Sequence, residues 1–329
     1  MPGIKEAKEL RKLWGGFWSS RVLLTANNYR IFDFLAVPRT VEEMAKRMKT
    51  DLRATEILLD AVTGLGLLKK SAGKYRNTSL ASAFLVSGSP LYQGDILRHA
   101  DALWQSWSGL DETVRTGKPN RTAPHNHDAF IRGMHNLASL KAGEVMRAIG
   151  LKGVRKALDL GGGPGTYSME MAKKSIAVTL FDLPDTIRIA KTIIRKAGVK
   201  GIEFLKGDFM VDRLGSGYDL IFVSQVLHAF SAEENLQLLR KCRGALNPGG
   251  RIVIQEFYLA SNRTSPSQSA LFSVNMLVNT EGGRCYAPSE MKKWLVGAGF
   301  REARETLQEE TVLVEARTAG PSPRPSSRK

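Results

Sequence analysis

The sequence predicts an α/β protein with a doubly wound, mostly parallel sheet in its second half and a smaller, mostly helical domain before it. From about residue 154, short apolar runs alternate with amphipathic segments, which is typical of a parallel sheet covered by helices on both faces. A glycine-rich turn between the first such strand and helix supports this class. We expect strands at 156–160, 177–183, 202–209, 218–227 and 251–259, helices at about 164–174, 184–197 and 231–246, then a helix pair at about 270–280 and 288–298 and two final strands in ETLQ and TVLVEA.

The first 90 residues predict three helices and a hairpin. Residues 16–36 carry apolar side chains at helical spacing, and Thr40 with Glu43 forms a capping-box signature for the next helix. A third helix is expected at about 52–66, and LLKKSAGKYRNTS then predicts two short strands around a tight turn. This order outlines a winged helix, a shape that contacts DNA in some proteins and serves as a dimerisation module in others.

Two longer helices are expected between these regions, at about 91–117 and 127–149, with a polar, proline-containing loop between them. Trp104 and Trp107 lie three residues apart, so they share one face of the first helix. That face packs in the core, forms a wall of an aromatic acceptor pocket, or does both.

The composition is that of a globular protein with a strongly basic balance. Hydrophobic residues make up 43% and charged residues 24%, with a formal net charge of +16. Part of the basic excess lies in residues 318–329, a Pro- and Ser-rich tail that we expect to be disordered. Elsewhere no dense basic block is present, so nucleic acid is not the expected partner.

The compartment expected from the sequence is a reducing one, the cytoplasm. Cys242 and Cys285 lie far apart and lack metal-ligand spacing, so neither a disulfide framework nor a metal site is predicted. A paired histidine in a loop, His125 with His127, is weak evidence for a metal. The first residues lack the apolar core of a signal peptide, and no uncharged apolar run approaches the roughly 18 residues of a membrane span.

A glycine-rich loop follows the first strand of the α/β domain, in LDLGGGPGTYS. Gly161, Gly163 and Gly165 suit a tight turn that a ligand approaches closely. In a dinucleotide fingerprint the next key position carries glycine or alanine, whereas here Thr166 stands there. This weakens a nicotinamide dinucleotide interpretation without excluding it.

The next two strands end in residues suited to an adenosine. Asp182 ends the second strand, where a carboxylate accepts from both ribose hydroxyls. Asp208 and Phe209 follow the third strand, where one would accept from the adenine amino group and the other would cover the ring. The alternatives are a helix cap for Asp182 and sheet packing for Phe209. Because three consecutive strand ends all carry residues suited to adenosine, the sequence favours a nucleoside ligand.

At this point the chain resembles the small-molecule O-methyltransferases of the caffeic acid and acetylserotonin type, including their bacterial relatives. The motifs that carry the resemblance are LDLGGGPGTYS, FDLPD, GDF, VLHAFSAEE and EGGRCYAPSEMKKWLVGAGF. The resemblance implies a winged-helix dimerisation domain, hence a homodimer, before a Rossmann-like domain that binds S-adenosylmethionine. It also implies that Gly161, Asp182, Asp208 and Phe209 bind the cofactor, that Ser224 replaces a cofactor-contacting basic residue, and that Phe130 and Met134 line the active site.

The candidate base is His228, which follows the fourth strand. Histidine titrates near neutrality and suits the removal of a hydroxyl proton, and in the family this histidine is the base. Glu256 matches the acid that orients it. Two positions depart from the plant pattern: Ala229 follows the histidine where an acid is expected, and Cys285 replaces a second glutamate. Cys285 would then line the pocket or pack as a small apolar residue.

These patterns predict four regions: a dimerisation domain (1–90), a helical segment that lines the acceptor pocket (91–150), a cofactor-binding methyltransferase domain (151–317) and the tail (318–329). The expected reaction is in-line transfer of a methyl group to a small, planar hydroxylated acceptor, which relies strongly on positioning. Because the acid set is reduced, carbon, nitrogen or sulfur acceptors stay open. A cofactor-binding regulator that contacts DNA, and an RNA methyltransferase, are further alternatives; no NPPY-type segment is present.

Overall fold

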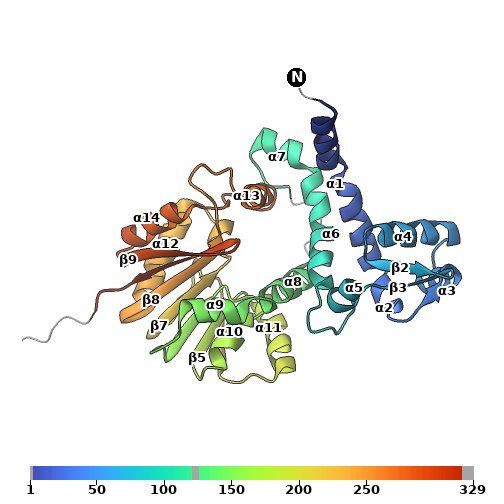
Figure 1. Ribbon diagram of the computed structural model, residues 1–329. Helices are drawn as coiled ribbons and strands as arrows, with labels where there is room; N and C mark the ends of the chain where they lie inside the picture. Colours follow the sequence, from blue (N-terminus) through green and yellow to red (C-terminus); the bar gives the residue numbers. More distant parts are fainter. Residues whose placement is uncertain (1–2, 121–125, 321–329) are drawn as a thin grey trace, which may run out of the picture. The chain divides into compact units, whose positions relative to one another are not determined.

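The computed structural model describes residues 3–120 and 126–320, and it divides into two compact units, Met1–Ala102 and Leu103–Lys329. Figure 1 shows the helices and strands of each unit. The division falls inside helix α6 (Gly94–Ser108). The finer region boundaries expected from the sequence stay a prediction.

The first unit consists of short helices around a small sheet, and its two hairpin strands follow the third expected helix as predicted. The capping box is confirmed, because the Thr40 hydroxyl accepts from the amide of Glu43 while the Glu43 carboxylate accepts from the amide of Thr40. One continuous helix over 16–36 is wrong, since Arg30 adopts a left-handed φ of 55° and ends the first helix early. The elements are α1 (Ile4–Asn28), α2 (Ile31–Phe34), β1 (Arg39–Thr40), α3 (Val41–Met48), α4 (Leu52–Gly64), β2 (Leu68–Ser71), β3 (Lys74–Asn77) and α5 (Ser79–Phe84), with sheet order β1-β3-β2.

The second unit is built on a seven-stranded sheet of order β6-β5-β4-β7-β8-β10-β9, which confirms the predicted fold class. Strands β4 to β8 run parallel, and β9 and β10 complete one edge in antiparallel fashion. The order reverses between β4 and β7, so ligands are expected at the carboxyl ends near this point. The strands are β4 (Lys156–Leu160), β5 (Ala177–Asp182), β6 (Ile202–Lys206), β7 (Tyr218–Ser224), β8 (Leu246–Phe257), β9 (Arg301–Gln308) and β10 (Thr311–Arg317).

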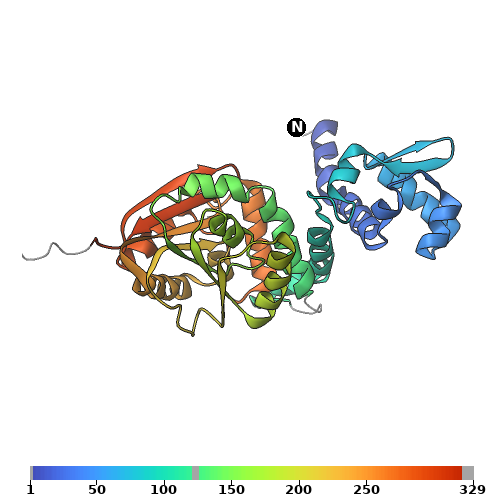
Figure 2. The same ribbon diagram turned by 90° about the horizontal axis from the view of Figure 1, so that it is seen from below.

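Helices cover both faces of this sheet (Figure 1, Figure 2). Apolar side chains of α9, α10 and α11 pack on one face, and those of α12 and α14 pack on the other. The two faces therefore form separate apolar layers, as alternation along the buried strands requires. The helices are α7 (Leu110–Thr116), α8 (His127–Ser139), α9 (Ala142–Ile149), α10 (Thr166–Ala172), α11 (Pro184–Ala197), α12 (Ala232–Ala245), α13 (Ser267–Asn279) and α14 (Pro288–Gly297), with a short 3-10 turn at Leu227–Ala229.

Each of the two long helices expected before the sheet is broken into two. Gly109 separates α6 from α7, and an added Cβ at this position would lie 1.8 Å from Nδ2 of Asn120. That amide donates to the carbonyl of Ser106 at 3.0 Å, so the following loop closes the end of α6. The third sheet strand is also shorter than expected and ends at Lys206, which leaves Asp208 and Phe209 in the loop beyond it.

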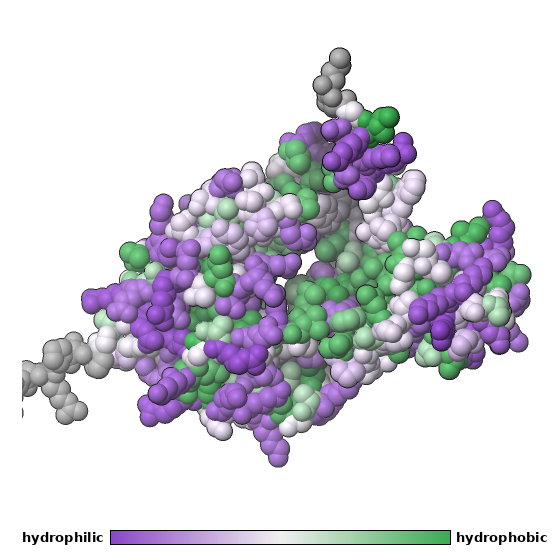
Figure 3. Space-filling model, viewed as in Figure 1, coloured by the Kyte–Doolittle hydropathy of each residue, from purple (hydrophilic) through white to green (hydrophobic). Residues whose placement is uncertain are grey.

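On the face of the protein in Figure 3, strongly hydrophilic side chains are spread over both units rather than gathered in one block. Within residues 3–120 and 126–320, no helix is both long and apolar enough to cross a membrane. The basic tail lies outside the described residues, so its expected disorder stays a prediction.

Candidate active site

The glycine loop joins β4 to α10 at the edge where the parallel strands end. Gly161 and Gly165 have φ angles of 65° and 76°, and a Cβ at either position would lie 2.7 Å from a buried neighbour, Val226 or Ile194. Gly163 also has a positive φ, 53°, but nothing lies within 4 Å of the place of its Cβ. Two glycines therefore allow close packing beneath the loop, and the third leaves open space where a ligand can approach the backbone.

Asp182 connects the glycine loop to the end of β5. Its carboxylate accepts from the amide of Gly163 at 2.8 Å and from the amide of Leu183 at 2.7 Å. Burial raises the pKa of Asp182, and the two backbone hydrogen bonds oppose that change. The carboxylate is thus held against the loop at the strand end, where a ribose would be bound.

Asp208 and Phe209 lie in the loop after β6, the neighbour of β5. The Asp208 carboxylate accepts from the amide of Met210 at 2.8 Å, which fixes the loop locally. The Phe209 ring meets Phe230 edge to face, with centroids 5.7 Å apart, and lies 6.3 Å from the ring of Phe181. Phe209 therefore packs against the sheet, and this packing also orients its ring in the loop.

A buried carboxylate beneath the glycine loop, Asp159, was missed in the sequence reasoning. It is 1% exposed and accepts from the hydroxyl of Ser168 at 2.6 Å. A Cβ at Gly162 would lie 2.8 Å from the Asp159 carboxyl carbon. Burial raises the pKa of Asp159 from 3.8 to about 6. An acidic residue inside an otherwise apolar strand was the signal available in LDLGGG.

Replacing Asp159 with asparagine is expected to stabilise the protein at alkaline pH. A pKa of about 6 in place of 3.8 means that the folded state loses stability as pH rises through about 4 to 6, by on the order of 3 kcal/mol. Asparagine keeps an acceptor for Ser168 and carries no charge. Thermal unfolding should show a higher Tm for the variant at pH 8 and nearly equal Tm values at pH 4. A Tm gain that is the same at both pH values would show that the gain does not come from removing the buried charge of Asp159.

His228 and Glu256 lie in direct contact. His228 occupies the 3-10 turn after β7, and its Nδ1–H donates to Glu256 Oε2 at 2.7 Å. The other carboxylate oxygen accepts from the amides of Leu227 at 2.8 Å and His228 at 3.3 Å. Glu256 thus fixes both the backbone turn and the ring, and this arrangement leaves Nε2 of His228 as the nitrogen able to accept a proton.

Two phenylalanines pack around the imidazole. The Phe272 ring, on α13, meets His228 edge to face at 5.0 Å, and Phe257 lies 6.2 Å away at the end of β8. The two phenylalanine rings lie 4.3 Å apart. The His228 side chain is 12% exposed and that of Glu256 4%, so the pair is largely shielded from solvent and the histidine is the more accessible member. Sequence spacing did not indicate either phenylalanine, because they come from separate elements.

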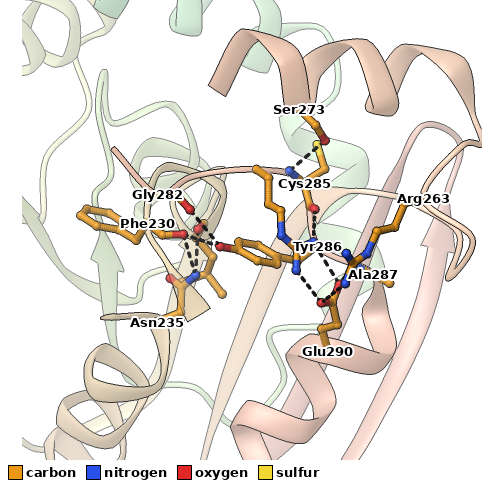
Figure 4. Close-up of polar contacts among 11 residues, drawn as sticks. Phe230, Asn235, Arg263, Ser273, Gly282, Cys285, Tyr286, Ala287 and Glu290 are labelled. Atoms are coloured by element: carbon orange, nitrogen blue, oxygen red, sulfur yellow. Dashed lines mark hydrogen bonds and ion pairs between the residues drawn. The ribbon is translucent and has the colours of Figure 1, made fainter. Parts of the chain in front are cut away.

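Cys285 lies close enough to Glu256 for the carboxylate to affect it. Burial, chiefly, and the charge of Glu256 raise the pKa of the thiol to about 11. Its backbone amide donates to the Ser273 hydroxyl at 3.1 Å (Figure 4). A neutral thiol therefore stands where an acid was expected, and Glu256 is the carboxylate that contacts His228.

Ser224, the last residue of β7, belongs to a neutral polar group. Its hydroxyl donates to Gln255 Oε1 at 2.9 Å. Both side chains affect the Tyr167 hydroxyl, whose pKa is raised mainly by burial. Gln255 is fully buried, and its Nε2 has no hydrogen-bond partner within the protein. A buried donor without a partner is costly, so this group fits a polar ligand atom or a bridging water at the strand ends.

The predicted aromatic and methionine pocket residues lie on two helices, α6 and α8. Trp107, half-buried, donates from its indole N–H to Asn275 of α13 at 2.9 Å, which ties α6 to the helix that carries Phe272. Trp104 lies one turn earlier and is also half-buried. Phe130 packs against the apolar layer of α11, and Met134 follows one helical turn later, half-buried. Trp107 therefore lies toward the helix that contacts His228, whereas Phe130 lies toward α11, the helix that follows Asp182.

His127 lies near Asp182. Its Nε2 is 3.0 Å from the Thr186 hydroxyl, and among the causes acting on the pKa of Asp182 it opposes the larger upward effect of burial. His125 falls outside the described residues. Among the residues that the structure describes, no group of three or more His, Cys, Asp or Glu side chains has a metal-binding arrangement.

Comparison with known proteins identifies the class that this fold and site define. Residues 99–301 match the family model of the O-methyltransferase domain, and residues 12–87 match that of the O-methyltransferase dimerisation domain. The chain belongs to the O-methyltransferase family and is a methyltransferase.

Individual relatives agree over most of the chain. It is 34% identical to 3-hydroxy-5-methyl-1-naphthoate 3-O-methyltransferase of Streptomyces sahachiroi, over 90% of each sequence. It is 31% identical to human acetylserotonin O-methyltransferase, over 87% of this chain and 90% of the human one. The crystal structure of human N-acetylserotonin methyltransferase in complex with SAM superposes with a TM-score of 0.87 at 28% identity, covering 97% of this chain and all of that one.

Proposed function

We propose that the protein methylates a hydroxyl group of a small, planar aromatic acceptor, with His228 as general base. The observation that carries the proposal is the buried contact between His228 Nδ1 and Glu256 Oε2, 2.7 Å long, beside the strand ends that form the nucleoside site. Two similar enzymes are named for a hydroxynaphthoate and for acetylserotonin. The edge-to-face packing of Phe272 on His228 supports an acceptor with a flat ring.

The cofactor is S-adenosylmethionine, and the residues present fit it. The open space at Gly163 suits close backbone approach, Asp182 suits the ribose hydroxyls, and Asp208 with Phe209 suits the adenine. The Gln255 amide nitrogen, which has no partner within the protein, provides a buried polar group on β8, two strands away from β4 in the sheet. When bound, S-adenosylmethionine supplies an electrophilic methyl group.

In the proposed mechanism the protein positions the acceptor and removes its proton. His228 accepts the hydroxyl proton at Nε2, because Nδ1 is engaged with Glu256. Glu256 stabilises the imidazolium that forms, and it also holds the turn through the Leu227 amide. The surrounding phenylalanines exclude water from the reacting oxygen. Half-buried Trp107, on α6, forms one wall of the proposed acceptor pocket.

A screen of aromatic hydroxyl compounds with methyl-labelled cofactor tests the acceptor class. Transfer of label to a hydroxyl oxygen, established by NMR of the product, supports the proposal. Label on carbon, nitrogen or sulfur would overturn the O-methylation of the natural acceptor and favour an enzyme that relies on positioning without base catalysis.

The first unit has an exposed apolar surface on α1, which suits contact with a second copy of the chain. Six large apolar side chains on α1 are each more than half exposed, and five of them recur at helical spacing. The rings of Trp14 and Trp18 lie 6.0 Å apart, edge to face. An exposed stripe of this kind marks a protein-protein contact. We propose that it meets a second copy of the chain through this winged-helix-like unit, since the matching family model is a dimerisation domain. The stripe consists of Leu10, Leu13, Trp14, Phe17 and Trp18.

Two charges in the α1 stripe are expected to dissociate the dimer. Leu13→Asp with Trp14→Asp removes two large apolar groups and would bury two carboxylates, so the dissociation constant should rise by at least about 100-fold. Sedimentation velocity measures whether the protein is a monomer or a dimer. The matched control is Ile57→Asp, an exposed apolar position on α4. A wild-type monomer, or a double variant that sediments like the wild type, would contradict the assignment.

A cytoplasmic location is proposed as well. Cys242 and Cys285 are both buried free thiols, which suits a reducing compartment. Subcellular fractionation of the producing cells tests this location.

A further inference from the structure

The turn that carries His228 lies under a loop from a distant part of the sequence, residues 280–286. An added Cβ at Gly283 would lie 2.3 Å from the carbonyl oxygen of His228 and 2.9 Å from the carbonyl carbon of Ala229. Both neighbours are backbone atoms, which cannot move aside at low cost. At Gly283 the loop therefore contacts the histidine turn through main chain, and only glycine permits this approach.

The same loop is hydrogen-bonded to the end of the turn. The Tyr286 hydroxyl donates to the carbonyl of Phe230 at 2.6 Å (Figure 4). The Tyr286 ring is fixed by an edge-to-face contact with Trp294, with centroids 4.7 Å apart, and by the Arg284 guanidinium, 4.3 Å from the ring centre. Burial raises the pKa of Tyr286, so its hydroxyl stays protonated and continues to donate in alkaline assays.

The turn is also held by other elements. Glu256 accepts from the Leu227 and His228 amides, and Asn235 donates to the Leu227 carbonyl at 2.9 Å and to the Phe230 carbonyl at 3.3 Å. These contacts fix the turn from the sheet and from α12. Loop 280–286 adds contacts at Gly283 and Tyr286, so a displacement of the His228 and Phe230 carbonyls would disturb this loop as well.

We propose that Gly283 and Tyr286 are positioning residues for His228, which hold its turn so that Nδ1 stays in hydrogen-bond contact with Glu256. This inference rests on the proposed function, because it concerns the same base. A general base is effective only within hydrogen-bond reach of its proton, and small displacements are costly to the rate.

Tyr286→Phe and Gly283→Ala test the proposal. We expect kcat to fall about 10-fold for the first and about 100-fold for the second, with the Kd for S-adenosylmethionine unchanged. The matched control is Tyr218→Phe, because the Tyr218 hydroxyl also donates to a backbone carbonyl, that of Leu214 at 3.0 Å, at the opposite end of β7. This control should keep the wild-type kcat.

NMR of 15N-histidine-labelled protein provides a readout that does not depend on turnover. Both loop variants should shift the His228 Nδ1–H resonance and speed its exchange with water, and Tyr218→Phe should not. Wild-type kcat and an unchanged resonance in Tyr286→Phe would overturn the proposal, even if Gly283→Ala fails to fold. Full turnover of His228→Ala combined with a shifted resonance in Tyr286→Phe would overturn the base assignment and leave the structural coupling in place.

Discussion

Replacing His228 with alanine is expected to lower kcat by about 10²–10⁴-fold while the Kd for S-adenosylmethionine stays near its wild-type value. The loss follows from geometry, because Nδ1 is committed to Glu256 at 2.7 Å and Nε2 is the acceptor left for the hydroxyl proton. Steady-state kinetics and calorimetry measure the two quantities. Loss of rate without loss of cofactor affinity separates proton removal from binding.

A rescue experiment and one further variant identify the origin of this loss of kcat. Added imidazole should restore part of the turnover of His228→Ala, since the cavity left by the side chain can hold a free base. Glu256→Gln keeps an acceptor oxygen but removes the charge that stabilises the imidazolium, so kcat should fall by a smaller factor. If His228→Ala turns over its true acceptor at the wild-type rate, the histidine has no part in proton removal.

The second large effect is expected for Asp182→Ala, which should weaken S-adenosylmethionine binding by 100-fold or more. Hydrogen bonds to a charged group contribute about 1.5–3 kcal/mol each, and the ribose offers two hydroxyls. The substitution also removes the acceptor of the Gly163 amide, 2.8 Å away, so the glycine loop loses its anchor. Isothermal titration calorimetry with S-adenosylmethionine and S-adenosylhomocysteine measures the change.

The matched control is Asp185→Ala, three residues along the chain. Asp185 is a highly exposed carboxylate in the first turn of α11, paired with Arg188 at 3.7 Å. Its removal should leave the Kd unchanged, because an exposed ion pair contributes little. An Asp182→Ala variant that binds both nucleosides as tightly as the wild type would remove this carboxylate from the cofactor site.

Much of the fold was predictable from local patterns. Alternating strands and helices after residue 154 gave the α/β class, and the capping box at Thr40 and Glu43 marked a helix start that the structure confirms. The helix ends at Arg30 and Gly109 were not predictable, because a left-handed residue and a contact with Asn120 depend on distant packing. The strand before Asp208 was expected to reach Phe209, whereas the last pairing with β5 joins Lys206 to Asp182.

The sequence by itself determined the order of the strands along the chain and the functional residues at or just beyond their carboxyl ends, because period, glycine spacing and charge are properties of short segments. It therefore placed Gly163, Asp182 and His228 at one edge of one sheet. Only the tertiary structure decided which distant side chains meet there: Phe272 against the imidazole, Asp159 beneath the glycine loop, and Gly283 against the histidine turn. Contacts between segments far apart in the chain depend on packing in three dimensions, and no local pattern specifies them.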